Sequence, residues 1–286
     1  NFSDLLFNPN QALDFFEQLS VPKRLDMNQG IHASAEATGL FGLPNYTWSN
    51  VHAWFDYYLK GINNGVASGP KVTMESKFNG TRTNFASWPA AQTVKRTWYL
   101  KPRGLFNEGS LSGSTNTTST SNEFWSGLDT TATSGIPLIS QILDAHVDVP
   151  VLNWVNSISR VNGAWFETGT FSSGLKIRGR VKFNARVTTS SPNAQLVAYL
   201  YDTDGLNWGK LITFGSTTLH NAPTGSAQNV TIRLDASAYD LPAGHTLVLA
   251  VDTQDIQYAK PNNSIYQLKL NFSSSVQQTL EVDTVQ

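Results

Sequence analysis

Asp4 and a histidine 28 positions after it, His32, are the residues whose types and order suggest chemistry. Asp4 precedes a helical pattern, and His32 follows a short strand pattern, 24–27, and the turn 28–30. A carboxylate that accepts a hydrogen bond from the Nδ1–H of a histidine fixes its tautomer, so that Nε2 can take a proton from a nucleophile. This pair therefore predicts a general base that is oriented by an acid.

The nucleophile that such a pair would serve is missing from the sequence. Gly-x-Ser-x-Gly, the turn that carries the serine of many hydrolases, occurs nowhere in the 286 residues. The order acid, helix, strand, histidine matches the closing part of a Ser…Asp…His hydrolase, and the first residue is Asn1 rather than Met. We therefore expect the C-terminal portion of a larger hydrolase, which is inactive alone and needs a serine from preceding residues or from a companion chain.

The first sixty residues carry helical patterns around one strand. Asn8-Pro9-Asn10 is a helix start, Ala12, Phe15, Phe16 and Leu19 recur at the spacing of one helical face, and Pro22 ends the helix. Ser49 or Asn50 is expected to cap a second helix, which ends at Lys60-Gly61 and whose apolar face holds Val51, Trp54, Phe55, Tyr58 and Leu59. If the remainder of a parallel sheet is absent, we expect the face of the first helix and the strand Leu25 to Met27 to be exposed.

Beyond about Gly65 the periodicity changes from helical to alternating. In the segment 175–187 apolar residues alternate with Lys176, Arg178, Arg180, Lys182 and Arg186, which is typical of a half-buried strand. Similar alternation in 196–201, 230–234 and 266–272, separated by turns such as Asp204-Gly205, predicts an antiparallel β-sandwich. The polar segment 109–122 is expected to be an exposed, mobile loop.

Composition excludes several classes of protein. With Lys+Arg 20 against Asp+Glu 21, the net charge is −1 and gives no reason to expect a nucleic-acid partner. Because there is no cysteine, disulfides and thiolate metal sites are excluded. No apolar run has the length of a membrane span. The lack of cysteine together with abundant Asn, Ser, Thr, Trp and Tyr favours a secreted or cell-envelope protein over a cytoplasmic one.

Three stretches together resemble the family of X-prolyl dipeptidyl-peptidases, cocaine esterase and α-amino-acid ester hydrolases. They are Asp4 with Gly30-Ile31-His32, the segment 54–61 (Trp-Phe-Asp-Tyr-Tyr-Leu-Lys-Gly), and 241–249 (Leu-Pro-Ala-Gly-His-Thr-Leu-Val-Leu). The resemblance covers nearly the whole chain but only the rear part of the family's architecture, in which a jelly roll follows an α/β-hydrolase domain.

The resemblance implies a mainly β fold and a serine hydrolase that cleaves an ester or amide, of dipeptidyl-peptidase or esterase type, with a peptide or ester as substrate. It implies the end of an α/β-hydrolase domain in residues 1–65, a connecting segment in 66–95 and a jelly-roll β-sandwich in 96–286. Asp4 matches the acid of the family's triad and His32 its base. No cofactor and no metal are expected.

Other residues have simpler interpretations. His245 opens a buried strand in the family pattern and is expected to be structural, while His52, His146 and His220 are not at metal-ligand spacing. The basic strand face 176–186 is expected to be solvated or a docking surface more often than an anion site. Asp204-Gly205 is a hairpin turn rather than a calcium loop.

A non-catalytic jelly-roll module that binds carbohydrate or protein is the alternative function, because jelly rolls often bind sugars and eight tryptophans could include a stacking platform. The Asp4 and His32 pair separates the two hypotheses, since a free binding module has no reason to carry it.

Overall fold

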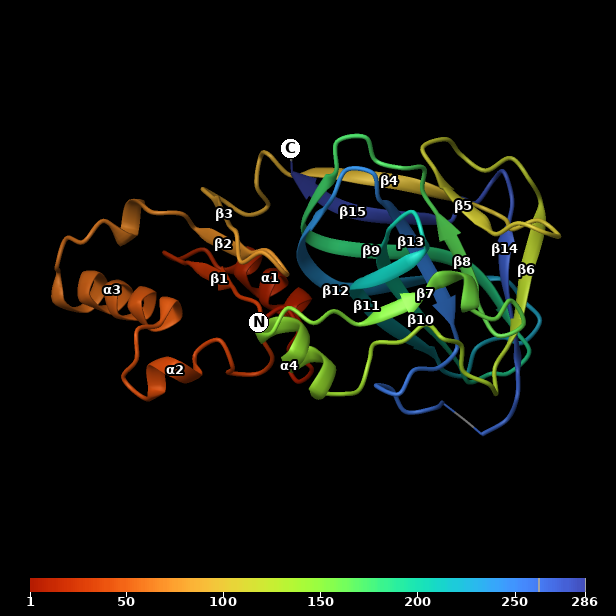
Figure 1. Ribbon diagram of the computed structural model, residues 1–286, viewed down its shortest axis with the longest axis horizontal. Coiled ribbons are helices and arrows are strands. Elements are labelled where there is room, and N and C mark those ends of the chain that lie inside the picture. The colour runs from red at the N-terminus through yellow and green to blue at the C-terminus, as the bar shows by residue number, and fades with distance from the viewer. Residues whose placement is uncertain (262, 286) are drawn as a thin grey trace.

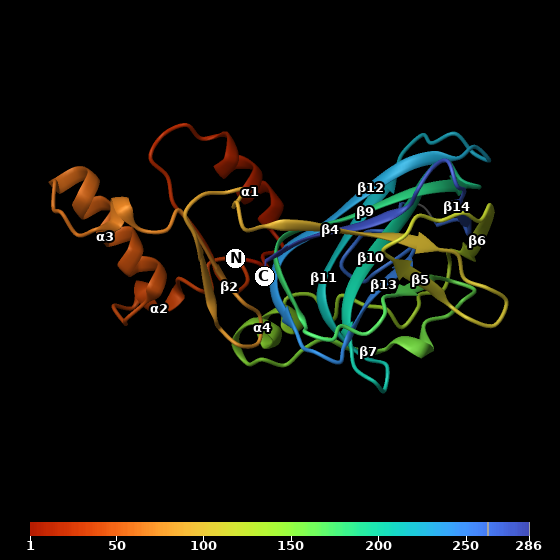
Figure 2. The same ribbon diagram turned by 90° about the horizontal axis from the view of Figure 1, so that it is seen from above.

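A computed structural model describes residues 1–261 and 263–285 of the chain. A small N-terminal unit of helices and a three-stranded sheet lies at one end of a large β-sandwich (Figure 1). Seen from the perpendicular direction, α1 (Pro9–Gln18) lies near the sandwich and α3 (Tyr46–Lys60) projects away from it (Figure 2). The chain is thus mainly β, with its helical part concentrated before residue 65.

The N-terminal unit follows the predicted order of helix, strand and helix. Asn8 caps α1 by accepting a hydrogen bond from the N–H of Asn10 at 2.8 Å, and Pro9 occupies the first turn, where its missing N–H costs nothing. β1 (Leu25–Met27) pairs in parallel with β2 (Val72–Glu75), which pairs antiparallel with β3 (Arg82–Phe85). A short helix, α2 (Ala37–Leu40), and the 3-10 turn η1 (Val66–Ser68) complete the unit.

Helix α3 differs from the prediction in its start and in its packing. Its N-cap is Asn45, whose side chain accepts from the N–H of Trp48 at 3.1 Å, so the expectation of a cap at Ser49 or Asn50 is wrong. None of its residues is buried, and Phe55 is 50% exposed. The helix ends at Gly61, which adopts a left-handed φ of 72° that favours glycine. Its apolar face is therefore only partly covered: Val51 and Trp54 are half-buried and line a groove together with Leu19 and Pro22.

The first helix buries a different face from the predicted one. Leu13 and Phe16 are buried with Met27 in a cluster that also holds Ala236 and Ala238 of the sandwich, whereas Phe15 is 64% exposed. The expectation that the whole stripe and the strand stay exposed is therefore wrong for Phe16 and Met27, because the N-terminal unit and the sandwich together cover them.

The sandwich is one continuous rolled sheet. Its strand order is β6-β14-β9-β15-β4-β5-β8-β13-β10-β11-β7, with β12 paired to β9. The link between β5 and β8 is parallel, whereas the other pairs in this sheet are antiparallel. The elements are β4 (Val94–Lys101), β5 (Gly109–Ser112), β6 (Thr120–Trp125), α4 (Ile139–His146), β7 (Leu152–Trp154), η2 (Val155–Ser157), β8 (Ala164–Glu167), β9 (Leu175–Thr189), β10 (Ala194–Thr203), β11 (Trp208–Leu219), β12 (Gln228–Leu241), β13 (Thr246–Asp252), β14 (Gln267–Phe272) and β15 (Thr279–Val285).

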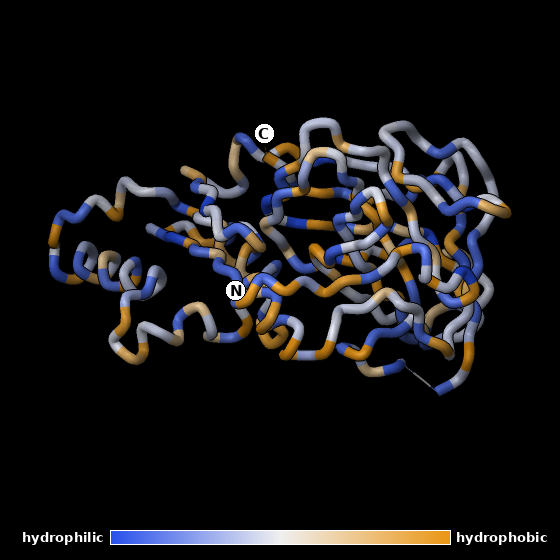
Figure 3. The backbone as a smooth tube through the Cα atoms, viewed as in Figure 1, coloured by the Kyte–Doolittle hydropathy of each residue, from blue (hydrophilic) through white to orange (hydrophobic). Residues whose placement is uncertain are grey.

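The predicted alternation produces the core of the sandwich. Ile177, Val181 and Phe183 of β9 point into the main hydrophobic cluster, and the tube in Figure 3 alternates between hydrophobic and hydrophilic along the strands. Strand β10 is buried along its whole length. Its even-numbered apolar residues join the main cluster, whereas Tyr199 and Tyr201 face a second cluster under the segment that contains η2.

The basic face of β9 docks the N-terminal unit. Arg180 donates to Glu17 at 2.8 Å and to Asp14 at 2.9 Å on α1. Arg178 is buried, with only 1% of its side chain exposed, and donates to Thr83 of β3 at 2.9 Å. The sequence predicts this face to be solvated or a docking surface. For Arg178 and Arg180 it is a docking surface.

The segment that was predicted to be a loop and the segment that was predicted to connect the two domains both contain strands. The segment 109–122 forms β5 and the start of β6, and Asn116 within it is buried and donates to the carbonyl oxygen of Thr118 at 2.7 Å. The expectation of an exposed loop is therefore wrong for 109–112 and 120–122, whereas residues 113–119 are irregular and mostly exposed. The segment 66–95 contributes β2 and β3 to the N-terminal sheet, and the division of the chain at residues 65 and 95 stays a proposal.

The packing of α1 is testable by substitution. Leu13→Ala should lower the free energy of unfolding by about 3 kcal/mol, because the side chain is fully buried and its loss leaves a cavity. Phe15→Ala, on the exposed side of the same helix, should change it by less than about 0.5 kcal/mol. Urea unfolding of both variants measures the difference. Equal losses would mean that α1 buries another face.

Candidate functional site

Backbone hydrogen bonds place Asp4 beside the turn that follows β1. The N–H of Phe2 donates to the carbonyl oxygen of Asn28 at 2.9 Å, and that of Ser3 donates to the carbonyl oxygen of Gly30 at 3.1 Å. Both segments therefore run in the same direction, and Asp4 lies where the chain after β1 turns. These hydrogen bonds bring Asp4 close to His32 although the two residues are 28 positions apart in sequence.

A tight turn presents His32. Gly30 has a φ of 143°, which only glycine adopts readily, and a Cβ there would lie 2.7 Å from the Oγ of Ser34. The N–H of Ile31 donates to Ser34 Oγ at 2.8 Å, and Ser34 N–H donates to the carbonyl oxygen of Ile31 at 3.1 Å. His32 lies inside this closed loop. Its neighbour Ala33 has a positive φ of 57°, so the turn includes a non-glycine residue in an unfavourable region.

The structure brings the two predicted residues together. His32 Nδ1 lies 3.2 Å from Asp4 Oδ2, within the expected hydrogen-bond range. The Asp4 side chain is 7% exposed, whereas that of His32 is 50% exposed. The ring of Phe7 lies 5.1 Å from the ring of His32 and covers one side of it.

Asp4 is held in its charged form. Burial raises the pKa of Asp4, but hydrogen bonds from the backbone N–H groups of Phe7 and Leu6, together with the bond to His32, outweigh that effect and lower the pKa below its ordinary 3.8. Oδ1 accepts from Leu6 at 2.9 Å and from Phe7 at 3.0 Å, which leaves Oδ2 for the histidine. An ionised Asp4 orients the imidazole with Nδ1–H toward it and Nε2 on the opposite side of the ring. This arrangement can accept a proton at Nε2.

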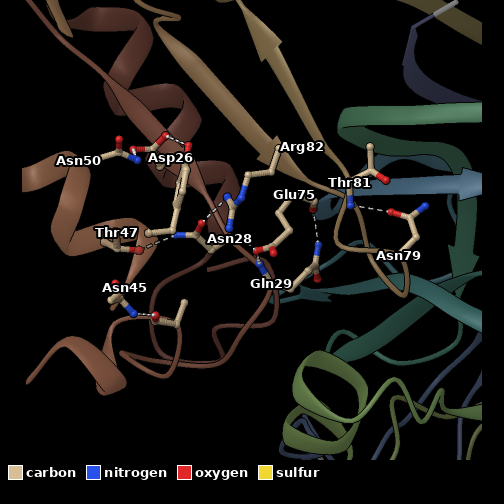
Figure 4. A network of polar contacts seen from close by, with 12 residues as sticks. Asp26, Asn28, Gln29, Asn45, Thr47, Asn50, Glu75, Asn79, Thr81 and Arg82 are labelled. Atoms are coloured by element: carbon tan, nitrogen blue, oxygen red, sulfur yellow. Dashed lines mark hydrogen bonds and ion pairs between the residues drawn. The ribbon is translucent and has the colours of Figure 1, made fainter. Parts of the chain in front are cut away.

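A polar network beneath the turn was not predicted from the sequence. Arg82 donates to Asn28 Oδ1 at 2.8 Å, and Asn28 Nδ2 donates to Thr47 Oγ1 at 3.2 Å (Figure 4). The N–H of Gln29 donates to Glu75 Oε2 at 3.0 Å, and its amide Nε2 donates to the carbonyl oxygen of Glu75 at 2.7 Å. These contacts fasten the residues before Gly30 to β2, β3 and α3. The sequence signal for this network is the pair of adjacent amide side chains, Asn28 and Gln29, that directly follows β1.

His146, which the sequence suggested was ordinary, reaches the same turn. Its Nε2 lies 2.8 Å from the Oγ of Ser34, although the two residues are 112 positions apart. His245 is part of a buried network, as its structural interpretation predicts: its Nδ1 lies 2.7 Å from Asp202 Oδ1, and Tyr239 donates to Asp202 Oδ2 at 2.5 Å. Asp204 accepts from the N–H groups of Leu206 and Trp208 and forms the expected turn.

Two further properties concern the chain as a whole. Within residues 1–261 and 263–285, no three His, Cys, Asp or Glu side chains are grouped to hold a metal ion. None of the helices in those same residues combines the length and apolar content that crossing a bilayer requires.

Solved structures share this architecture. A CocE/NonD family hydrolase from Staphylococcus aureus matches with a TM-score of 0.71 and 14% identity, over 100% of this chain and 53% of its own. An α-amino acid ester hydrolase matches with a TM-score of 0.69 and 13% identity, over 96% and 52%. An aminopeptidase from a marine sediment archaeon, Thaumarchaeota archaeon, matches with a TM-score of 0.63 and 12% identity, over 82% and 43%. The fold is that of the C-terminal region of such hydrolases, and this chain spans about half the length of each.

A family model identifies the larger part of the sequence. Residues 64–284 match the X-Pro dipeptidyl-peptidase C-terminal non-catalytic domain, and the chain belongs to this family. Asp4 and His32 lie before the matched residues, so the word non-catalytic does not refer to them. No curated protein matches the sequence.

The lowered pKa of Asp4 predicts how stability depends on pH. Because the folded pKa lies below the unfolded value of 3.8, ionised Asp4 stabilises the fold above about pH 4, and this contribution is lost as the pH falls through the folded pKa. Asp4→Asn should therefore lower the free energy of unfolding at about pH 7, and its difference from the unsubstituted protein should shrink toward about pH 2. Urea unfolding across this range measures it, with the exposed Asp148→Asn as control. A difference that does not change with pH contradicts the assignment.

Proposed function

We propose that the chain is the C-terminal portion of a serine hydrolase that cleaves an ester or amide bond and that it supplies the acid and the base of the triad. The observation that carries the proposal is the hydrogen bond of 3.2 Å between His32 Nδ1 and the buried Asp4. Nε2 would take the proton of a serine hydroxyl as it attacks the carbonyl carbon and return it to the leaving group, while Asp4 stabilises the imidazolium.

The serine would come from a catalytic portion that precedes Asn1. The parallel pairing of β1 with β2 and the parallel course of residues 1–3 beside 28–30 are consistent with a further strand entering at Asn1 and lying next to β1. Parallel strands are nearly always covered on both faces. A catalytic portion would also cover exposed side chains close to His32, such as Leu6 and Phe7, which are 71% and 64% exposed.

The sandwich would then have a supporting role in the hydrolase. Arg178 and Arg180 of β9 dock the unit that carries Asp4 and His32, so the sandwich holds this unit by charged contacts as well as by the apolar cluster around Leu13. The substrate class that follows from the resemblance is a peptide or an ester. A secreted or cell-envelope location belongs to the same proposal and rests on composition.

The test uses the full-length protein with a p-nitrophenyl ester, an aminoacyl-prolyl p-nitroanilide and a fluorophosphonate probe that labels activated serines. His32→Ala should lower kcat by at least about a thousandfold, because the serine loses its base. Asp4→Asn should lower it by about a hundredfold or more, since the tautomer is no longer fixed.

The control is His52→Ala, which removes a histidine of α3 that contacts Trp48 and not the turn. It should leave kcat and fluorophosphonate labelling unchanged. Full activity of His32→Ala on both substrates, with unchanged labelling, would reject the proposed function.

A further inference from the structure

Helix α4 belongs to the sandwich in sequence but lies against the N-terminal unit. It is inserted between β6 and β7, and in Figure 1 it lies next to the N-terminus of the chain, away from most of the strands. Figure 2 shows it again on the side of the sandwich that faces the three-stranded sheet. A helix in this place can transmit the position of the sandwich to the turn around His32.

The inner side of α4 is anchored by a buried ion pair. Asp144 Oδ2 lies 2.7 Å from Lys77 Nζ, and both side chains are less than a tenth exposed, at 7% and 8%. Lys77 Nζ also donates to the carbonyl oxygen of Leu211 at 3.0 Å on β11. One turn earlier, Gln141 donates to the carbonyl oxygen of Ser134 at 3.2 Å. Because a buried charge that loses its partner costs several kcal/mol, this side of the helix is firmly held.

The last residue of α4 contacts the turn that carries His32. His146 Nε2 lies 2.8 Å from Ser34 Oγ, and the same oxygen accepts from the N–H of Ile31 at 2.8 Å. Ile31 and Ser34 flank His32 on both sides in sequence. The hydrogen bond from α4 therefore reaches the atom that closes the loop around the candidate base.

The backbone conformation of the turn explains why such a contact matters. It contains two residues with positive φ, Gly30 and Ala33, and for alanine this conformation is unfavourable. His32 is half exposed, and its ring contacts Asp4 and the ring of Phe7. Side chains from three neighbouring segments restrain the turn: Asn1 Nδ2 donates to the carbonyl oxygen of Ile31 at 2.7 Å, Asn45 Nδ2 donates to that of Ala35 at 2.7 Å, and His146 contacts Ser34.

We propose that α4 is a positioning element for the base, and that His146 is the positioning residue, which restrains the His32 turn through Ser34. This rests on the proposed function, in which His32 is the base. His146 touches neither substrate nor the reacting atoms in this proposal. It acts by keeping Nε2 of His32 aligned, and small displacements of a catalytic group reduce the rate strongly.

The experiment compares His146→Ala, His146→Gln and the matched control His220→Ala in the full-length protein. The amide of Gln can restore the hydrogen bond to Ser34, and His220 is an exposed histidine after β11. Two readouts are measured: kcat and KM with the p-nitrophenyl ester, and hydrogen exchange by mass spectrometry of a peptide that covers residues 29–35.

His146→Ala should accelerate exchange in 29–35 and lower kcat by about threefold to tenfold with KM changed less than about twofold, because one hydrogen bond that orients the base is lost. His146→Gln should restore both values, and His220→Ala should change neither. In a Ser34→Ala background the substitution of His146 should have little further effect, since the two side chains act through one contact.

The outcomes separate this proposal from the proposed function. Unchanged exchange in His146→Ala, or faster exchange with unchanged kcat, overturns the positioning role while His32→Ala still decides the function. If His32→Ala retains activity, the function fails and the positioning of a base fails with it. The role of the hydrogen bond is also overturned if His146→Gln does not restore kcat. The same holds if His146→Ala still lowers kcat in the Ser34→Ala background.

Discussion

The packing of the sandwich against the N-terminal unit depends on the contacts of one buried side chain, Lys77. Lys77 lies in the turn between β2 and β3, its Nζ contacts Asp144 of α4 and the carbonyl oxygen of Leu211 in β11, and its N–H donates to the carbonyl oxygen of Ala238 in β12. Burial raises the pKa of Asp144, and the neighbouring ammonium group opposes this rise. Such a pair adds little net stability but makes every arrangement that separates its partners costly. The relative position of the three-stranded sheet, α4 and the sandwich is therefore defined.

Local patterns in the sequence predicted several of the elements and the pairing of Asp4 with His32. Asn8 and Pro9 predicted the start of α1 because capping and a fixed φ act over a few residues. The alternation in 175–187 predicted β9 because a strand with one face on a core must place every second side chain there. Asp4 and His32 were recognised from their order along the chain, and the structure brings their side chains together. What their contact does chemically stays a prediction.

Other features could not be predicted because they depend on which segments meet. Arg178 looks in sequence like any charged residue on the outer face of a strand, yet β3 covers it and leaves 1% of it exposed. His146 and Ser34 carry no shared pattern, since their contact exists only because α4 crosses to the N-terminal unit. Polar residues in 109–122 suggested disorder, but side-chain amides such as that of Asn116 satisfy backbone groups there and allow burial. The apolar face of α3 predicted burial, but none of its residues is fully buried.

The position of β15 in the sheet affects how the sandwich is made during synthesis. This strand, residues 279–285, lies between β9 and β4 and pairs with both, so that Thr284 is opposite Val94 across 190 positions of sequence. On a ribosome, β4 and β9 emerge long before the strand that joins them. Their edges stay open until β15 emerges, and open edges can pair with other chains. A nascent chain of this kind should depend on chaperones until β15 is released, and loss of those few residues should cause aggregation rather than a slightly smaller sandwich.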